Sequence, residues 1–260
     1  MNKATSLIPA ERQQQIIEIL RNKLTVRGSI LSGLLGVSEM TIRRDLDALE
    51  RRGFVERTHG GAAFRQERLT GKFNYGHSTR VNPMEKRRIA ACASKMIEPN
   101  DTVYIGEGYT AAQILRHVDP HLRFTIFSNN IGVTAEMENK AAELIMLSGT
   151  YDPATNALTG PLTMEVIRQV NATKVFLGVD GLSLNRGLTT PNLEIAVIER
   201  SMIQYTRGKV IVMTDHSKFG LVAEISIAPL KHIDVLITNR KIPEDYQKNL
   251  DLMGVKVVIA

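Results

Sequence analysis

The sequence has almost no cysteine, since Cys92 is the only one among its 260 residues. A single cysteine excludes an internal disulfide and a cysteine-rich zinc site. Cys92 falls among alanines in a helical pattern, which is typical of a small packed residue rather than a nucleophile. The six histidines show no spacing typical of metal ligands. We therefore expect neither a metal nor a cofactor.

Long apolar runs are also absent. No run approaches the roughly 20 residues that a membrane-spanning helix needs. Residues 1–15 contain no apolar core of the kind found in secretion signals. With 43% hydrophobic and 23% charged residues, the composition is that of an ordinary globular protein, and 260 residues suit two domains. We expect a cytoplasmic protein that does not bind membranes.

The net charge is confined to one end of the chain. Residues 1–80 contain 14 Lys and Arg against 8 Asp and Glu, whereas residues 81–260 contain 19 of each kind. The whole formal excess of +6 therefore lies in the first segment. A basic segment joined to a neutral remainder is the electrostatic pattern of a protein that binds a phosphate backbone.

Residues 28–61 have the pattern of a winged helix-turn-helix, which follows a first helix expected at 9–22. Leu31, Leu34 and Leu35 predict the apolar face of a short helix. Gly36 then supplies a residue that tolerates a sharp turn, because it has no Cβ.

A second helix and a hairpin complete the pattern. Ser38 is a suitable N-cap, and Ile42, Leu46 and Leu49 recur at helical spacing on one face. Gly53 marks the expected end of this helix. The hairpin is expected as a strand over 54–58 and a turn over 59–61.

In a helix-turn-helix, the first residues of the second helix contact base edges in the major groove. Arg43 or Arg44 is suited to bind guanine bidentately, while Ser38 and Thr41 suit phosphate oxygens. The predicted DNA-binding residues are Ser38, Glu39, Met40, Thr41, Arg43, Arg44, Arg57 and His59. The alternative is an amphipathic helix pair with a solvated basic face. The order of cap, arginine pair and wing favours DNA binding.

From Pro83 onward, apolar strands alternate with helices, which predicts a mostly parallel α/β sheet covered on both faces. The expected strands are 102–105, 124–127, 143–147, 173–179, 209–214, 234–238 and 255–259. The expected helices are 84–97, 110–117, 131–138, 162–170, 193–206 and 244–253. We divide the chain into a DNA-binding domain (8–63), a linker (64–83) and an α/β sensor domain (84–260).

Ligands of such sheets bind outside the carboxyl ends of the strands. Glycines, small hydroxyl and amide residues and one lysine follow these strands, and they suit an anionic, hydroxyl-rich molecule such as a sugar phosphate. The predicted effector-binding residues are Gly108, Tyr109, Thr110, Ser128, Asn129, Asn130, Gly149, Asp180 and Lys218. Such residues are also ordinary in turns, so the prediction depends on their agreement.

The segments VSEMTIRRDL (37–46) and LERRGFVERTHGGA (49–62) closely resemble the DeoR-type family of bacterial regulators of sugar metabolism. The resemblance covers residues 8–260, and it continues in EKRRIA (85–90), VFLGVDGL (175–182) and DHSKFG (215–220). It implies a sensor that resembles ribose-5-phosphate isomerase in fold, and a phosphorylated sugar or related metabolite as effector.

The resemblance also implies a repressor of a carbohydrate-utilisation operon that binds double-stranded operator DNA. We expect a homodimer or homotetramer, since helix-turn-helix proteins match paired half-sites. Several positions depart from the family pattern: Gly106 replaces an acid, Tyr109 replaces a small hydroxyl residue, and Gly28 replaces an apolar residue. In addition, Ser128-Asn129-Asn130 stands where Thr-Asn-Ser is common, and Ser148-Gly149 stands where Gly-Gly is common.

The alternative function is a sugar-phosphate isomerase with an accessory DNA-binding domain. Such an enzyme would need paired acids near the Asp-Gly motif. This chain has Asp180-Gly181-Leu182-Ser183, which lacks the second acid. We therefore expect no enzymatic activity.

Overall fold

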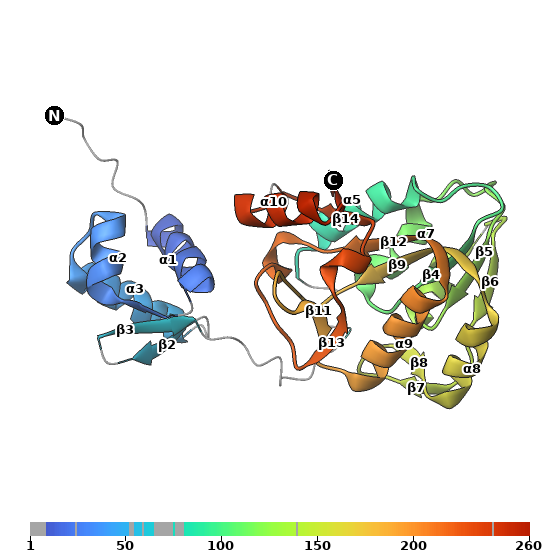
Figure 1. Cartoon of the computed structure of the whole chain (residues 1–260), viewed down its shortest axis with the longest axis horizontal. Helices are drawn as coiled ribbons and strands as arrows, with labels where there is room; N and C mark the ends of the chain where they lie inside the picture. The colour runs from blue at the N-terminus through green and yellow to red at the C-terminus, as the bar shows by residue number, and fades with distance from the viewer. Residues whose placement is uncertain are drawn as a thin grey trace. The chain divides into compact units, whose positions relative to one another are not determined.

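The structure is a computed structural model that describes residues 9–23, 25–51, 55–58, 60–64, 75, 81–138, 140–240 and 242–260. The chain divides into two compact units, Met1–Arg68 and Leu69–Ala260, which are described separately below (Figure 1).

The first unit contains three helices and a small antiparallel sheet. The helices are α1 (Pro9–Lys23), α2 (Gly28–Leu35) and α3 (Glu39–Arg51). The strands are β1 (Thr25–Arg27), β2 (Val55–Thr58) and β3 (Gly61–Phe64), in the order β1-β3-β2. The helices and the hairpin confirm the winged helix-turn-helix. Strand β1 was not predicted, and it extends the hairpin into a three-stranded sheet.

The apolar spacing of α2 and α3 determines the core of this unit. Leu31 of α2 and Ile42, Leu46 and Leu49 of α3 are all buried there. Leu34, which we expected on the same face as Leu31, is instead 57% exposed. Leu34 and Leu35 lie on opposite sides of Leu31 around the helix axis, and only Leu35 packs against the core.

The turn between α2 and α3 has the predicted geometry. Gly36 adopts a left-handed conformation with φ of 64°. The Ser38 hydroxyl accepts a hydrogen bond from the Thr41 N–H at 3.2 Å, as an N-cap does. At the other end of α2, the Gly28 N–H donates to the carbonyl oxygen of Gly60 at 2.9 Å. The start of α2 is therefore fastened to the wing.

The second unit is built around a seven-stranded sheet in which every pair of neighbours is parallel. The strand order is β15-β14-β12-β9-β4-β5-β6. The strands are β4 (Thr102–Ile105), β5 (Thr125–Ser128), β6 (Glu143–Met146), β9 (Ala172–Gly178), β12 (Thr206–Met213), β14 (Val235–Thr238) and β15 (Lys256–Ile259). This confirms the parallel α/β architecture.

Helices pack on this sheet, and most lie where the sequence predicted them. They are α5 (Pro83–Ser94), α6 (Tyr109–Ala112), α7 (Ile114–His117), α8 (Pro161–Gln169), α9 (Leu193–Gln204) and α10 (Glu244–Leu252). The predicted helix 110–117 is divided at Gln113 into α6 and α7. The predicted helix 131–138 is a 3-10 helix, η1 (Ile131–Glu136). Two further 3-10 helices are η2 (His216–Lys218) and η3 (Leu230–His232).

Short antiparallel strands were not predicted. One hairpin consists of β7 (Thr150–Asp152) and β8 (Ala157–Thr159), and a separate sheet has the order β10-β11-β13. Its strands are β10 (Gly181–Ser183), β11 (Gly187–Thr190) and β13 (Ile225–Ala228). These strands flank the carboxyl edge of the parallel sheet, because β10 begins three residues after β9 ends.

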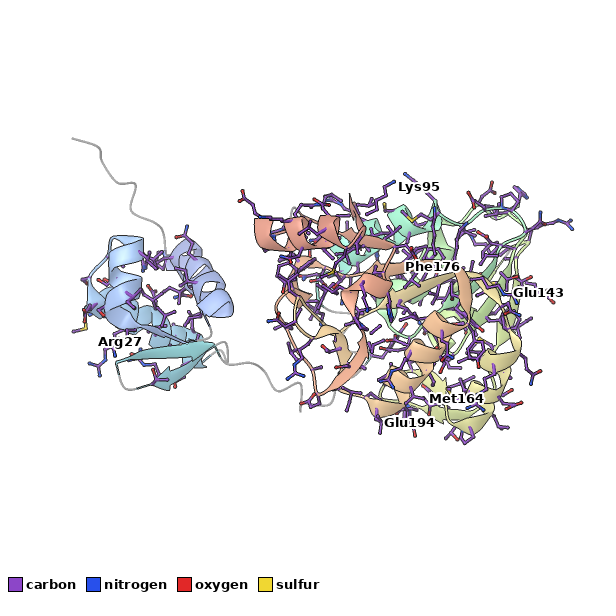
Figure 2. The ribbon with its side chains drawn as sticks, viewed as in Figure 1. Arg27, Lys95, Glu143, Met164, Phe176 and Glu194 are labelled. Carbon is purple, nitrogen blue, oxygen red and sulfur yellow. The ribbon has the colours of Figure 1, made fainter. Side chains whose placement is uncertain are left out.

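The interior of the second unit is apolar on both faces of the sheet. Phe176 of β9 is fully buried near the middle of the unit, whereas Lys95, Glu143 and Glu194 lie on its outside (Figure 2). Tyr104 of β4 is also fully buried, and its hydroxyl donates to the Ile167 carbonyl at 2.9 Å. The sheet is therefore a rigid platform for the loops at its carboxyl edge.

One buried ion pair joins α1 to α3. The Nε atom of Arg12 lies 2.5 Å from Asp45 Oδ2, and the two side chains are 9% and 5% exposed. Gln13 Nε2 also donates to Asp45 Oδ1 at 3.1 Å. Breaking such a pair leaves a charge buried without its partner.

We expect Arg12→Ala to destabilise the first unit by about 3–5 kcal/mol, because Asp45 stays buried. Calorimetric unfolding of the full chain measures this loss as a lower midpoint for one transition. The control is Arg168→Ala, which breaks a surface pair with Glu165 and should cost less than about 1 kcal/mol. Equal midpoints for the two variants would contradict the assignment.

Candidate DNA-binding and effector sites

A groove of about 420 Å³ lies between α3 and the wing of the first unit. It is lined by Gly28, Glu39, Met40, Ile42, Arg43, Leu46, Arg57, Gly60 and Gly61. Four of the predicted DNA-binding residues thus lie together, and they come from the start of α3 and from β2. Met40 is 60% exposed, and Arg43 and Arg44 are both exposed. Arg44 does not line the groove.

The hydroxyls of Ser38 and Thr41 lie 2.9 Å apart and bond each other at the start of α3. Ser38 is exposed and Thr41 is half-buried. His59 lies outside the described residues. The structure therefore places six of the eight predicted residues at the start of α3, and Arg57 beside them on the wing.

Arg57 is fastened to α3. Its Nη1 atom lies 3.6 Å from Asp47 Oδ1, and its backbone N–H donates to Glu50 Oε1 at 3.1 Å. Its side chain is only 27% exposed. The wing is therefore tied to the same helix that carries Arg43 and Arg44.

In the second unit, the chain order reverses between β4 and β9. The strands β4, β5 and β6 follow one another toward one edge, and β9, β12, β14 and β15 continue toward the other. In open α/β sheets, ligands bind at such a reversal, outside the carboxyl ends of the two central strands, and we refer to this place as the crevice. The loops that flank it are Gly106–Thr110 after β4 and Val179–Asp180 after β9.

The Asn130 side chain holds the loop after β4. Its Nδ2 donates to the carbonyl oxygens of Gly106 at 3.1 Å and Gly108 at 2.9 Å, and its Oδ1 accepts from the Gly132 N–H at 2.9 Å. Ser128 supports it from below, because its hydroxyl donates to Ile105 and accepts from the Asn130 N–H. Both side chains are fully buried.

Asn129 and Gly149 lie along the β7–β8 hairpin. Asn129 is 1% exposed, its Nδ2 donates to the Leu158 carbonyl at 3.3 Å, and its Oδ1 has no partner among the described residues. Gly149 has a φ of 144°, and a Cβ there would lie 2.4 Å from the Thr159 carbonyl oxygen. Its lack of a side chain lets the chain before β7 pack closely against β8 and α8.

Charged groups gather at the crevice. Asp180 accepts from the Thr190 hydroxyl at 2.8 Å and interacts electrostatically with Lys218 and Lys86. Glu107 interacts with Asp180 and with Lys218. The cluster thus combines carboxyl groups with two lysines, drawn from loops after different strands and from α5.

Burial raises the pKa of Glu107 to about 8, and the charges of Asp180 and Asp152 act in the same direction, while Lys218 lowers it. Burial also raises the pKa of Glu199 well above its usual range, and nearby Glu107 adds to this effect. Carboxyl groups with raised pKa values hold their protons, so they can donate as well as accept hydrogen bonds.

Asp215 and Lys86 shift in the opposite direction. Burial by itself raises the pKa of Asp215, but hydrogen bonds from Ser217 and the charges of Lys218 and Lys86 outweigh it, so the pKa is lowered. Burial lowers the pKa of Lys86, although Asp215 counteracts it. Asp215 also accepts from Asn82 Nδ2 at 3.3 Å, which fastens the start of α5 to this cluster.

Lys86 and Glu199 were not predicted as site residues, although the sequence pattern of their helices contains a signal. On α5 the buried positions include Lys86, Ile89, Ala90 and Ala93, so the lysine lies on the apolar stripe. Glu199 lies in the same way between the buried Ile195 and Met202 of α9. A charged residue on the buried stripe of a helix needs a partner or a changed protonation state, which points to a polar site.

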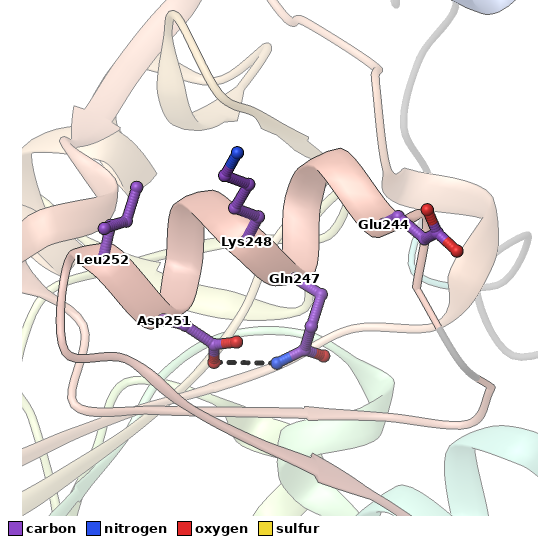
Figure 3. A pocket seen from close by; sticks show the side chains of 5 residues that line it. All are labelled: Glu244, Gln247, Lys248, Asp251 and Leu252. Carbon is purple, nitrogen blue, oxygen red and sulfur yellow. Dashed lines mark hydrogen bonds between the residues drawn. The ribbon is translucent and has the colours of Figure 1, made fainter.

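A second hollow, of about 450 Å³, lies on the surface of α10. Figure 3 shows its lining residues, with a hydrogen bond of 2.8 Å from Gln247 Nε2 to Asp251 Oδ1. It includes none of the predicted site residues. Within the described ranges, no group of three or more His, Cys, Asp or Glu side chains is arranged to hold a metal ion. No helix among those residues is long and apolar enough to span a bilayer.

The raised pKa of Glu107 predicts a dependence of stability on pH. The folded state keeps the proton up to a pKa of about 8, whereas the unfolded chain loses it near 4.5. Between these values the folded state binds more protons, so stability falls as the pH rises. We expect the melting temperature of the second unit to fall as the pH rises from about 4.5 to about 8, and Glu107→Gln to reduce this fall.

Glu165→Gln, at an exposed position of α8, is the matched control and should keep the wild-type pH profile. If Glu107→Gln and Glu165→Gln gave the same profile, the perturbed proton would not belong to Glu107.

Sequence comparisons agree with this architecture. A model of the DeoR-like helix-turn-helix domain matches residues 12–68, and one of the DeoR C-terminal sensor domain matches residues 81–240. The transcriptional regulator GlpR of Haloferax volcanii is 32% identical over 97% of this chain and 98% of its own. A putative aga operon transcriptional repressor of Escherichia coli O157:H7 is 31% identical (96% and 93%). The regulator GolR of Listeria innocua is also 31% identical (98% and 100%).

Two solved structures show more distant similarity. The sorbitol operon regulator SorC of Klebsiella pneumoniae gives a TM-score of 0.41 at 11% identity, over 95% of this chain and 99% of its own. Ribose 5-phosphate isomerase A of Methanocaldococcus jannaschii gives 0.39 at 16%, over 53% and 55%. The matched sensor domain alone spans more than half of the chain, and the helix-turn-helix model covers the winged unit. The chain is therefore a member of the DeoR family and a DNA-binding transcriptional regulator.

Proposed function

We propose that this regulator represses a carbohydrate-utilisation operon and that a phosphorylated sugar controls it from the crevice between β4 and β9. The observation that carries the proposal is the charged cluster there, in which Lys218 and Lys86 lie with Asp180 and Glu107. The lysines suit a phosphate group, and the carboxyl groups suit sugar hydroxyls. Two relatives support the same proposal, since one is named a putative repressor of the aga operon and the other is named a transcriptional regulator.

Within this proposal, the predicted effector residues have two roles. Ser128 and Asn130 shape the loop after β4, because their polar atoms bond the protein itself. Asp180 and Lys218 contact the effector, together with the backbone of Gly108, Tyr109 and Thr110. Asn129 and Gly149 border the site along the hairpin. We further propose a cytoplasmic homo-oligomer, in which two winged domains bind paired half-sites.

We propose that the sensor binds its effector without converting it. The alternative, a sugar-phosphate isomerase, would use Asp180 or Glu107 as a base. An assay for ketose formation from ribose 5-phosphate distinguishes the two functions. An isomerase would form the ketose and lose this activity in Asp180→Asn, whereas a sensor that only binds its effector would form no ketose.

Arg43 and Arg44 are our candidates for base contacts. On an operator selected by the wild-type protein from random DNA, replacement by Ala of the residue that contacts a base should cost about 1–3 kcal/mol and relax specificity at one position. Loss of a phosphate contact alone should lower the salt slope by about 0.9. Arg168→Ala is the control. Wild-type binding by Arg43→Ala, Arg44→Ala and the double variant would contradict this assignment.

Lys218 is our candidate for the effector's phosphate. A thermal-shift screen of pentose, hexose and glycerol phosphates identifies a ligand, because binding to the folded state raises the melting temperature. Lys218→Ala should abolish that shift and the release of operator, but leave operator binding intact. The control, Lys248→Ala on the exposed surface of α10, should respond as the wild type does. If Lys218→Ala shows the wild-type melting shift and release of operator, Lys218 does not bind the effector.

A further inference from the structure

Tyr75 lies between the two segments matched by the family, 12–68 and 81–240, yet it is packed against the sensor. Its backbone N–H donates to the Ala154 carbonyl at 2.8 Å, in the turn of the β7–β8 hairpin. Its side chain forms a hydrogen bond with that of Asn156 in the same turn. The backbone and the side chain of Tyr75 therefore both bond to the β7–β8 hairpin, which borders the crevice.

The ring of Tyr75 contacts the loop after β4. It meets the ring of Tyr109 edge to face, with centroids 6.4 Å apart and an angle of 72°. Burial raises the pKa of Tyr75, and Tyr109 and Glu107 add to the effect, which agrees with a ring seated beside this loop. Tyr109 is itself the position at which the sequence departs from the small hydroxyl residue of the family.

Gly132 leaves the space in which the Tyr75 hydroxyl sits. A Cβ on Gly132 would lie 2.3 Å from that oxygen, and the next atoms are Asn130 Oδ1 at 3.0 Å and Ala112 Cβ at 3.2 Å. Asn130 in turn holds the carbonyls of Gly106 and Gly108. Tyr75 is thus packed against the segments that follow β4 and β5.

We propose that Tyr75 is a wall of the effector site, where it forms with Tyr109 an aromatic surface for the apolar face of the sugar. Aromatic rings offer a large apolar contact at little cost in conformational entropy. This inference rests on the proposed function, and it adds a specificity-determining residue from outside the segment matched to the sensor family. Phosphate alone lacks an apolar face and gains nothing from the pair.

The test is calorimetric titration of the full chain with the sugar phosphate, among ribose 5-phosphate, fructose 6-phosphate and glycerol 3-phosphate, that most raises the wild-type melting temperature. Inorganic phosphate is the second probe. Tyr75→Ala should weaken sugar phosphate binding about tenfold and leave inorganic phosphate unchanged. Tyr75→Phe should retain most of the affinity. Tyr151→Ala is the control, since the exposed Tyr151 hydroxyl bonds the same Asn156 at 2.9 Å.

Gly132 provides a second route in case Tyr75→Ala disturbs the fold. Gly132→Ala should displace the Tyr75 hydroxyl and weaken sugar phosphate binding. Adding Tyr75→Phe to that variant should restore binding, because the clashing oxygen is gone. A defect caused by the neighbouring Asn130 Oδ1 or Ala112 Cβ would not be relieved in this way.

Unchanged or tighter binding of the sugar phosphate by Tyr75→Ala would overturn the inference, as would wild-type affinity in Gly132→Ala. If no sugar phosphate shifts the wild-type melting temperature, the proposed function itself fails and this inference fails with it. The two failures are therefore distinguishable.

Discussion

The side-chain amide of Asn130 fixes the geometry on which the sensor site depends. Its two donors hold the carbonyls of Gly106 and Gly108, and its acceptor caps the start of η1. The loops after β4 and β5 therefore form one body. Because the amide is fully buried, losing any of these hydrogen bonds would leave a buried polar group without a partner, which would destabilise the folded state. The position of Glu107 and the packing of Tyr75 against Gly132 both depend on these hydrogen bonds.

Apolar periodicity predicted the architecture well. Strand runs such as 102–105 and the helical spacing of Ile42, Leu46 and Leu49 specify burial directly, and the structure has elements in those places. The short antiparallel strands escaped prediction because segments such as Gly181–Ser183 and Gly187–Thr190 combine glycine and hydroxyl residues and contain no apolar run. They depend on tertiary contact instead, as at Gly181, where a Cβ would lie 2.6 Å from the Leu221 carbonyl oxygen.

The candidate site was predictable only in part. Residues after strands were found because strand order and direction place them at one edge. Lys86 and Glu199 were missed because they lie inside helices, where sequence position says nothing about the crevice. Nothing in the sequence near Tyr75 indicates its contacts with Tyr109 and Asn156, which exist only in the folded sensor. The roles of the predicted residues in binding DNA or effector remain predictions.

The buried pair of Arg12 and Asp45 has a consequence for genetics. It fastens α1 to α3, so the helix with Arg43 and Arg44 owes part of its position to a residue some thirty places earlier in the sequence. In a selection for mutants that no longer silence a reporter gene, alleles would therefore form two groups. One would change the exposed face of α3, and the other would change α1, which carries none of the predicted DNA contacts. Mutants of the second group that have lost Arg12 would regain silencing through second changes at Asp45, the residue that Arg12 pairs with.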